Sequence, residues 1–440
     1  MNSRKELFIT SFALFSLFFG AANLLLPPLL GYNAGENWIW VAIGFMITGV
    51  VIPIIGILAH AKLQGTLYDF GKKVSPQFSL IYCILIYVIS IAIPSPRTAS
   101  ATHEIAIHPA FGTSPLLTSS IYFILVLVFV LNRSKILSFV GKFLTPLIVI
   151  MLLMVIGIGL FSSEMTTNVS QFKTPIVTGV LEGYQTFDAI GAAVVGAFII
   201  ISVNIRHKGS FEEKRALIAK SGWVAGFGLF MIYAGLISVG AYYGSEIIIN
   251  SELSDDMQRA NLLRGVSIAA LGTFGNTVLS ILISLACFTT AVGIIAGTAD
   301  YFKGLLGNSH SVYVATSIIS CVLGVVIGQL DFHSIIVIAF PILLFVYPIT
   351  IVLIILNVLS KRWSSPLMFR AVVIVTFLFS IPDAVGFIRN AMGYESPSEI
   401  LNTLIDYIPL AKHQLGWVLP ALLTCLSVGL LSYKTNSIES

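Results

Sequence analysis

The chain has 440 residues, of which 57% are hydrophobic and only 10% are charged, and its mean hydropathy is +0.95. Soluble domains carry about 25% charged residues, so this composition excludes a soluble protein and indicates a helical protein that crosses the membrane many times. The formal net charge of +4 comes from bases scattered over short loops, which offer nucleic acid no continuous basic face.

Apolar runs predict twelve membrane spans, because about 20 apolar residues cross the hydrocarbon core as a helix. In chain order they are 7–31, 38–60, 78–96, 114–132, 143–162, 178–203, 217–243, 276–299, 311–329, 334–359, 367–388 and 415–433. With the N-terminus inside, 18 of the 24 Lys and Arg residues fall on the inner side. The positive-inside rule therefore places both termini in the cytoplasm.

The arrangement of the spans predicts two repeats of five and two additional helices. Residues 1–203 form the first repeat and run into span six, 204–360 complete the second repeat, and 361–440 carry the two extra spans. Before the eighth span, the uncharged run is too long for one helix, and Gly272 and Gly275 predict a break there.

The first span is interrupted at Gly20-Ala21-Ala22-Asn23, followed by Pro27-Pro28. Irregular backbone at membrane depth survives only where protein or a water-filled cavity satisfies it. A half-helix that begins after the break would turn free N–H groups toward a carboxylate, and the Asn23 amide can bind a cation or an anion. The alternative is a proline kink with close helix packing through small residues.

The sixth span is interrupted in the same way, at Gln185 to Gly191. Asp188 lies about ten residues into this span, where a carboxylate is costly and indicates a functional site. It could ligate a cation, pair with a substrate ammonium group or carry a proton; the alternative is a solvated acid near the outer mouth. Broken helices in corresponding positions of two halves indicate the binding site of a secondary transporter.

Two further groups carry polar chemistry. Ala286, Thr289 and Thr290 share one helical face, and their oxygens suit a hard cation, although each Thr could instead bond its own helix. Arg97 follows Pro94-Ser95-Pro96 close to the predicted outer end of span three. It is either part of an external gate, with Asp331 or Asp383 as its partner, or an ordinary interfacial arginine.

Four segments resemble the branched-chain amino acid:cation symporters of the BrnQ type. They are FFGAANLLLPPLLG at 18–31, IPSPRTASATHE at 93–104, GKFLTP at 141–146 and YQTFDAIGA at 184–192. The chain departs from the usual family pattern at Ala22, which replaces a glycine, and at Ser95-Pro96, which are inserted before Arg97. The resemblance covers nearly the whole chain.

The resemblance implies the LeuT-like fold of the amino acid–polyamine–cation superfamily, with five-plus-five inverted repeats. Carried over by position, it places the substrate at Gly20, Ala21, Ala22, Asn23, Thr186, Phe187, Asp188 and Ala189. It places sodium at Ser16, Phe19, Asn23, Thr186, Ala286, Thr289 and Thr290. It implies a bacterial cytoplasmic membrane and no cofactor besides the coupling ion.

We therefore expect a symporter, not an enzyme, that takes up leucine, isoleucine and valine with a cation, sodium by preference, within membrane lipid. A proton-coupled symporter is the nearest alternative, in which Lys142 reaches toward the Thr289–Thr290 site and replaces sodium. A membrane amino acid sensor is the alternative from another class, although the sequence has no soluble output domain. An intramembrane enzyme would need a paired nucleophile and base, and the sequence offers none.

Overall fold

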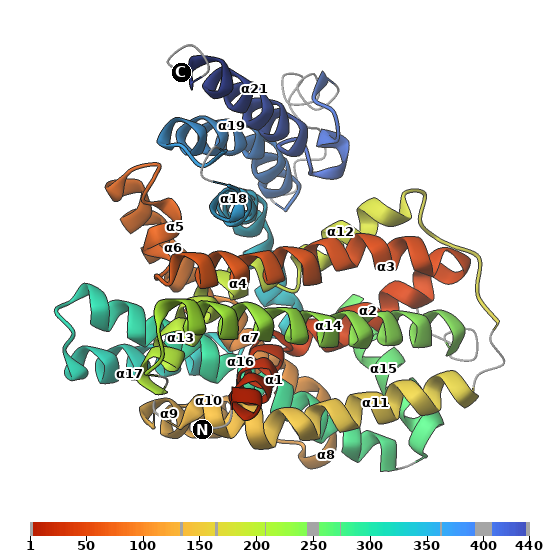
Figure 1. Cartoon of the computed structure of the whole chain (residues 1–440). Coiled ribbons are helices and arrows are strands. Elements are labelled where there is room, and N and C mark those ends of the chain that lie inside the picture. The colour runs from red at the N-terminus through yellow and green to blue at the C-terminus, as the bar shows by residue number, and fades with distance from the viewer. Residues whose placement is uncertain are drawn as a thin grey trace.

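The computed structural model describes residues 3–132, 135–162, 166–206, 208–243, 255–272, 274–360, 363–391 and 407–436, and these form helices and connecting turns. Figure 1 shows them as one helical bundle. In the first half the helices are α1 (Ser3–Phe18), α2 (Ala21–Ala34), η1 (Gly35–Asn37), α3 (Trp38–Met46), η2 (Ile47–Val51), α4 (Ile52–Leu63), α5 (Tyr68–Gly71), α6 (Pro76–Ala92), α7 (Pro94–Ala101), η3 (Thr102–Ile107), α8 (His108–Phe111), α9 (Pro115–Leu131), α10 (Ile136–Phe139), η4 (Val140–Leu144) and α11 (Thr145–Ser162). In the second half they are α12 (Pro175–Tyr184), α13 (Asp188–Arg206), α14 (Phe211–Tyr243), α15 (Asp255–Leu271), α16 (Phe274–Leu305), α17 (His310–Ile327), α18 (Phe332–Val358), α19 (Pro366–Ala391), η7 (Ala411–His413) and α21 (Val418–Asn436).

The helices account for the twelve expected spans. Within the described residues, nine helical runs are long and apolar enough to cross a membrane, and α9 and α21 are shorter apolar helices. The first span consists of α1 with α2, and the sixth of α12 with α13. The expected break before the eighth span is also confirmed, since α15 ends at Leu271, Gly272 has a φ of +63°, and α16 begins at Phe274.

The predicted end of span three is wrong. Helix α6 stops at Ala92, but α7, η3 and α8 carry the helical run on to Phe111 instead of leaving the membrane near residue 96. Pro94 takes the first position of α7, where a missing N–H costs nothing, and the Arg97 N–H still reaches the Ile93 carbonyl at 3.2 Å. The prolines therefore bend the span and do not end it.

Both predicted interruptions of spans one and six are confirmed. Residues Phe19 and Gly20 separate α1 from α2, and residues 185–187 separate α12 from α13. Pro27 and Pro28 lie inside α2, further along than the break. They cannot donate to the carbonyls one turn earlier, which leaves those carbonyls without their usual helical donor.

Helix α2, which follows the first break, packs closely against α14. A Cβ on Gly31 of α2 would lie 1.9 Å from the Ile237 carbonyl of α14, and a Cβ on Gly240 of α14 would lie 1.9 Å from the Pro28 carbonyl. Only glycine permits this approach, as is typical of membrane helix interfaces. In Figure 1, α19 packs beside α18 at the edge of the bundle, and α21 packs on α19. The division of the chain at 203 and 360 stays a prediction.

Candidate substrate and cation site

At the first break, the backbone is hydrogen-bonded by a side chain from the same segment. The Gly20 N–H donates to Asn23 Oδ1 at 3.1 Å, so the asparagine side chain satisfies a donor at the start of α2. A Cβ on Gly20 would lie 3.1 Å from Thr290 Oγ1, so glycine lets the break approach α16. The N–H groups of the first turn of α2 have no acceptor within the helix, an arrangement that favours negative charge.

Asn23 also joins the first break to the second. Its Nδ2 donates to Asp188 Oδ2 at 2.7 Å and to the hydroxyl of Tyr233, and that hydroxyl lies 3.3 Å from the same carboxylate oxygen. Asn23 and Asp188 are only 2% and 3% exposed. Because Asp188 is the first residue of α13, the positive end of that helix also stabilises its carboxylate.

The second break has an unusual backbone. Phe187 has a φ of +63°, in the left-handed region that a bulky residue rarely adopts. Thr186 Oγ1 donates to the Gly183 carbonyl at 2.8 Å and accepts from the Asp188 N–H at 3.3 Å, which bridges the gap between the two half-helices. The Ala189 N–H, one of the orphan donors of α13, donates to the Tyr347 hydroxyl at 3.1 Å.

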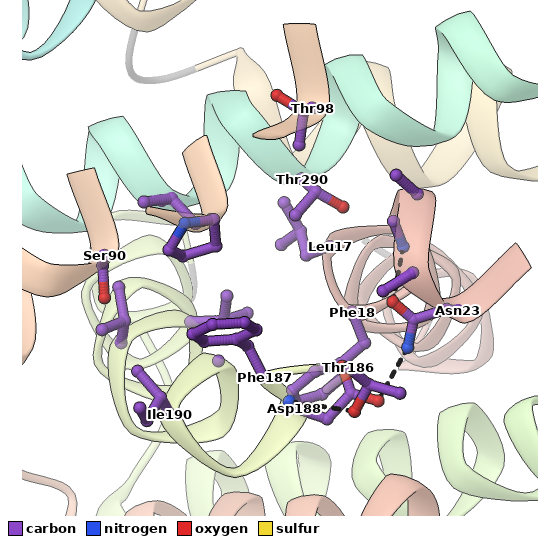
Figure 2. A pocket seen from close by; sticks show the side chains of 18 of the residues that line it. Leu17, Phe18, Asn23, Ser90, Thr98, Thr186, Phe187, Asp188, Ile190 and Thr290 are labelled. Carbon is purple, nitrogen blue, oxygen red and sulfur yellow. Dashed lines mark hydrogen bonds between the residues drawn. The ribbon is translucent and has the colours of Figure 1, made fainter. Parts of the chain in front are cut away.

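A buried pocket of about 50 Å³ lies between the two breaks, with room for a few water molecules. Figure 2 shows Thr98 and Thr290 on one side of it and Phe18, Thr186 and Asp188 on the other, with Asn23 beside Asp188. The residues that line it are Leu17, Phe18, Gly20, Ala21, Ala22, Asn23, Ser90, Pro94, Arg97, Thr98, Thr186, Phe187, Asp188, Ile190, Gly191, Val194, Val195, Thr290 and Ile294. All the predicted substrate-binding residues except Ala189 are among them.

The predicted cation residues are partly brought together. Thr289 Oγ1 donates to the Ser16 carbonyl at 2.9 Å, lies 3.0 Å from the Ala286 carbonyl, and accepts from the Ser16 hydroxyl at 2.9 Å. Thr290 Oγ1 is buried and has no hydrogen-bond partner among the described residues. Phe19 follows the end of α1, and its N–H donates to the Phe15 carbonyl.

Neutral oxygens dominate this group. In the part of the chain that the structure describes, no cluster of three or more His, Cys, Asp or Glu side chains is placed to hold a metal ion. A hard cation at this position would therefore be held by hydroxyl and carbonyl oxygens. The end of α1 assists, because the carbonyl end of a helix attracts positive charge.

Arg97 lies at the pocket and not at the outer end of a span. Its guanidinium donates to the Gln185 carbonyl at 2.9 Å and lies 6.0 Å from the centre of the Phe187 ring, and the residue is 3% exposed. Asp331 is exposed and caps α18, accepting from the Ser334 N–H at 2.8 Å. Asp383 is buried in α19. Pairing of Arg97 with either acid as a gate stays a prediction.

Sequence reasoning missed three contributors to this site. Tyr233 and Tyr347 supply the hydroxyls that bond both breaks, but a single tyrosine in an apolar run has no distinguishing pattern. The third is an ion pair of 3.1 Å between Arg259 of α15 and Glu182 of α12, which sits directly before the second break. Glu182 also accepts from the Gln185 side chain at 3.0 Å.

Comparison with known proteins identifies the family. The sequence profile described as branched-chain amino acid transport protein matches residues 3–435. This chain belongs to the branched-chain amino acid transport protein family. Its members are transport proteins and not enzymes, in keeping with a bundle that spans the membrane many times.

Two relatives illustrate the match. The chain is 31% identical over 428 residues to the branched-chain amino acid transport system 2 carrier protein of Pseudomonas aeruginosa, covering 94% of this chain and 93% of the relative. It is 32% identical over 430 residues to the branched-chain amino acid permease BraB of Bacillus subtilis, covering 95% and 93%. Both relatives therefore match along almost their whole length.

The fold is also shared with a more distant transporter. A Na⁺-coupled sialic acid symporter, solved in a substrate-bound outward-open state, superimposes with a TM-score of 0.59 at 12% identity, over 97% of this chain and 90% of that one. At this identity the likeness shows the fold alone, which is the LeuT-like fold with broken first and sixth spans.

Proposed function

We propose that this protein imports leucine, isoleucine and valine into the cytoplasm by symport with sodium, through alternating access to the pocket between the two broken helices. No bond is made or broken. The protein would lie in a bacterial cytoplasmic membrane with both termini in the cytoplasm, an orientation that the distribution of Lys and Arg supports. The names of the relatives support the substrate class.

The observation that carries this proposal is the hydrogen bond between Asn23 and Asp188 at a pocket with apolar walls. The positive end of α2, at its first turn, suits the carboxylate of an amino acid, and the Asp188 carboxylate suits its ammonium group. Leu17, Ile190 and Ile294 supply apolar surface for an aliphatic side chain. A pocket of about 50 Å³ must widen to admit one, so binding is coupled to movement of the half-helices.

Sodium is supported by the oxygens at Ser16, Ala286 and Thr289 and by the coupling named for the sialic acid symporter. A cation there would tie the end of α1 to α16. The ordered break would then bind substrate more tightly, and linkage requires the substrate to strengthen cation binding equally. Lys142, the residue of the proton-coupled alternative, is exposed, and its ammonium lies 4.9 Å from the centre of the Phe143 ring.

Uptake of radiolabelled leucine into proteoliposomes tests this proposal, with sodium and proton gradients imposed separately. We expect an inward sodium gradient to drive accumulation and a proton gradient of equal size to drive none. Isoleucine and valine should compete with leucine, whereas lysine and glutamate should not. Accumulation on a proton gradient alone would contradict sodium coupling, and leucine binding without uptake under either gradient would indicate a sensor.

A further inference from the structure

A second, larger cavity lies on the side of the membrane where α13 and α16 end, which is the cytoplasmic side in the proposed orientation. It encloses about 500 Å³ and is lined by Tyr68 of α5, Tyr87 of α6, Ala197 and Ile201 of α13, and Asp300 and Tyr301 of α16. We call it the inner vestibule. Tyr68, Asp300 and Lys303 give its wall polar and charged groups of both signs.

Three helices continue directly from the central pocket into the inner vestibule. On α13, Val194 lines the pocket and Ala197, three residues later, lines the vestibule. On α16, Ile294 lines the pocket and Gly297 lines the vestibule. Helix α6 runs in the opposite direction, so Ser90 lines the pocket and Tyr87, three residues earlier, lines the vestibule. Residues three or four apart share one helical face, so the two cavities lie one above the other along the same faces.

Two aromatic rings lie at the boundary. Tyr87 and Tyr301 stack with their ring centres 4.3 Å apart and their planes at 17°. Both line the vestibule, and both are buried, at 1% and 9% exposure. They belong to two of the helices that pass between the cavities, closer to the cytoplasm than the pocket residues on the same helices. The stack therefore occupies the path from the pocket to the vestibule.

The Tyr301 ring is held by apolar contacts, namely the stack on Tyr87 and an edge contact with the Phe302 ring, whose centre lies 5.3 Å away. Its buried hydroxyl bonds no oxygen or nitrogen within the described part of the chain, and its polar neighbour is the weakly bonding thiol of Cys83. By contrast, the hydroxyl of Tyr347 is bonded to the second break. Separating the Tyr87 and Tyr301 rings therefore undoes apolar contacts but breaks no strong hydrogen bond of Tyr301.

We propose that Tyr87 and Tyr301 form the inner gate of the transporter, and that substrate and cation leave the central pocket between α6, α13 and α16 into the inner vestibule. Asp300 and Lys303 then receive the two charges of an amino acid as it reaches water. What passes through the gate rests on the proposed function; the position of the gate rests on the stack and the two cavities.

Thiol labelling tests the gate without reference to any substrate. Ser90→Cys places a thiol in the central pocket, and Ala197→Cys places one in the inner vestibule. In inside-out membrane vesicles, a membrane-impermeant thiol reagent then approaches from the cytoplasmic side. The same protein with Ser90 and Ala197 intact gives the background for each tyrosine variant, because Cys83 lies beside Tyr301 and could become accessible when that ring is removed.

We expect the thiol introduced at position 197 to react in every variant, and the thiol at position 90 to react slowly while both tyrosines are present. Tyr301→Ala should raise the labelling rate at position 90 at least tenfold, and Tyr87→Ala should act similarly. Tyr301→Phe, which retains the ring, should leave that rate within about twofold of its starting value. Slow labelling at position 90 in both alanine variants, or no labelling at position 197, would overturn the proposal.

A second measurement does not depend on the alanine variants being well folded. Tyr87→Cys combined with Tyr301→Cys replaces the stacked rings with thiols on α6 and α16 that can bind Cd²⁺ from the path, and Cys83→Ser removes the neighbouring native thiol. We expect Cd²⁺ to stop leucine exchange across proteoliposomes and a chelator to restore it, whereas each single tyrosine variant should be much less sensitive. Exchange that continues at the same rate in Cd²⁺ would overturn the gate. Failure of the wild-type protein to carry leucine would instead refute the proposed function and leave the labelling test intact.

Discussion

The two broken helices are held in opposite ways. The break after α1 is surrounded by neutral oxygens: Gly20 bonds Asn23, and the Ser16 carbonyl accepts from Thr289. The break before α13 is surrounded by charge, because Arg97 donates to the Gln185 carbonyl and Arg259 pairs with Glu182. The first break is thus held by neutral groups, whereas one arginine bonds the backbone of the second break and another arginine forms an ion pair beside it.

Under the proposed function, the two breaks have different roles, although they look alike in sequence. The oxygens beside the first break would bind the cation, and the N-terminal turn of α2 would face the substrate carboxylate. The second break supplies the buried carboxylate Asp188 and is fixed from the other side by arginine. The bond of 2.7 Å from Asn23 to Asp188 makes them one site.

Removing the hydroxyls beside the first break should have a large effect on sodium. Each hydroxyl contact with a charged partner is worth about 1.5–3 kcal/mol, and about 1.4 kcal/mol is a factor of ten, so losing two contacts weakens binding by roughly two orders of magnitude or more. In Thr289→Val with Thr290→Ala, the sodium dependence of leucine uptake should therefore shift to about 100-fold higher sodium.

Thr298→Val is the matched control for that variant. Thr298 lies further along α16 and is equally buried, and within the described residues its hydroxyl donates to the Ile294 carbonyl of its own helix at 2.8 Å. It should leave the sodium dependence almost unchanged, and so should Lys142→Met. If the double threonine variant keeps the native sodium dependence while Lys142→Met loses a dependence on pH, the coupling ion is the proton.

Removing the Tyr233 hydroxyl, which supports the hydrogen bond between Asn23 and Asp188, should have an intermediate effect on leucine binding. Tyr233→Phe removes the hydroxyl that bonds Asn23 and lies 3.3 Å from the Asp188 carboxylate oxygen. A hydrogen bond to a charged group is worth about 1.5–3 kcal/mol, so leucine affinity should fall by about tenfold or more, as measured by equilibrium binding. Tyr313→Phe, which loses a bond of 2.8 Å to the Val130 carbonyl away from the pocket, should bind leucine normally. Equal leucine affinities of the Tyr233→Phe and Tyr313→Phe proteins would show that the Tyr233 hydroxyl does not contribute to substrate binding.

Breaking the ion pair between Arg259 and Glu182, beside the second break, should have the smallest effect on transport. Arg259→Gln removes the charge but keeps an amide donor for Glu182, whose side chain is 23% exposed, so the rate of leucine exchange should change by about fivefold at most. Exchanging the charges, with Arg259→Glu and Glu182→Arg together, should recover much of the loss. Single and swapped variants that all exchange leucine at the native rate would show that the pair does not act on the second break.

The two breaks could be predicted from the sequence because small and polar residues at mid-membrane depth are costly unless a cavity or a neighbouring helix satisfies them. Asn23 and Asp188 could be named for the same reason. Tyr233 and Tyr347 could not, since a tyrosine among apolar residues is equally consistent with packing or with the membrane interface. Only the structure brings both hydroxyls to the breaks, from helices far along the chain.

Arg97 shows a different limit of the sequence. From the sequence, Arg97 is expected close to the outer end of span three, either in an external gate or as an interfacial arginine. The structure instead restarts the helix at Pro94 and turns Arg97 toward the Gln185 carbonyl. Proline at the first position of a helix and proline after the last look alike in a single sequence, and only the packing partner distinguishes them.

The link between the two breaks is tested by leucine binding to purified Asn23→Ala protein, with and without sodium. The helix already begins anew beside Asn23, so alanine should leave the fold intact, as circular dichroism and size-exclusion chromatography would verify. Asn132→Ala, at the exposed end of α9, is the control. We expect Asn132→Ala to bind leucine like the wild type, more tightly with sodium, and Asn23→Ala to bind at least 100-fold more weakly with no response to sodium. Wild-type affinity and sodium response in folded Asn23→Ala protein would contradict a site shared by the two broken helices.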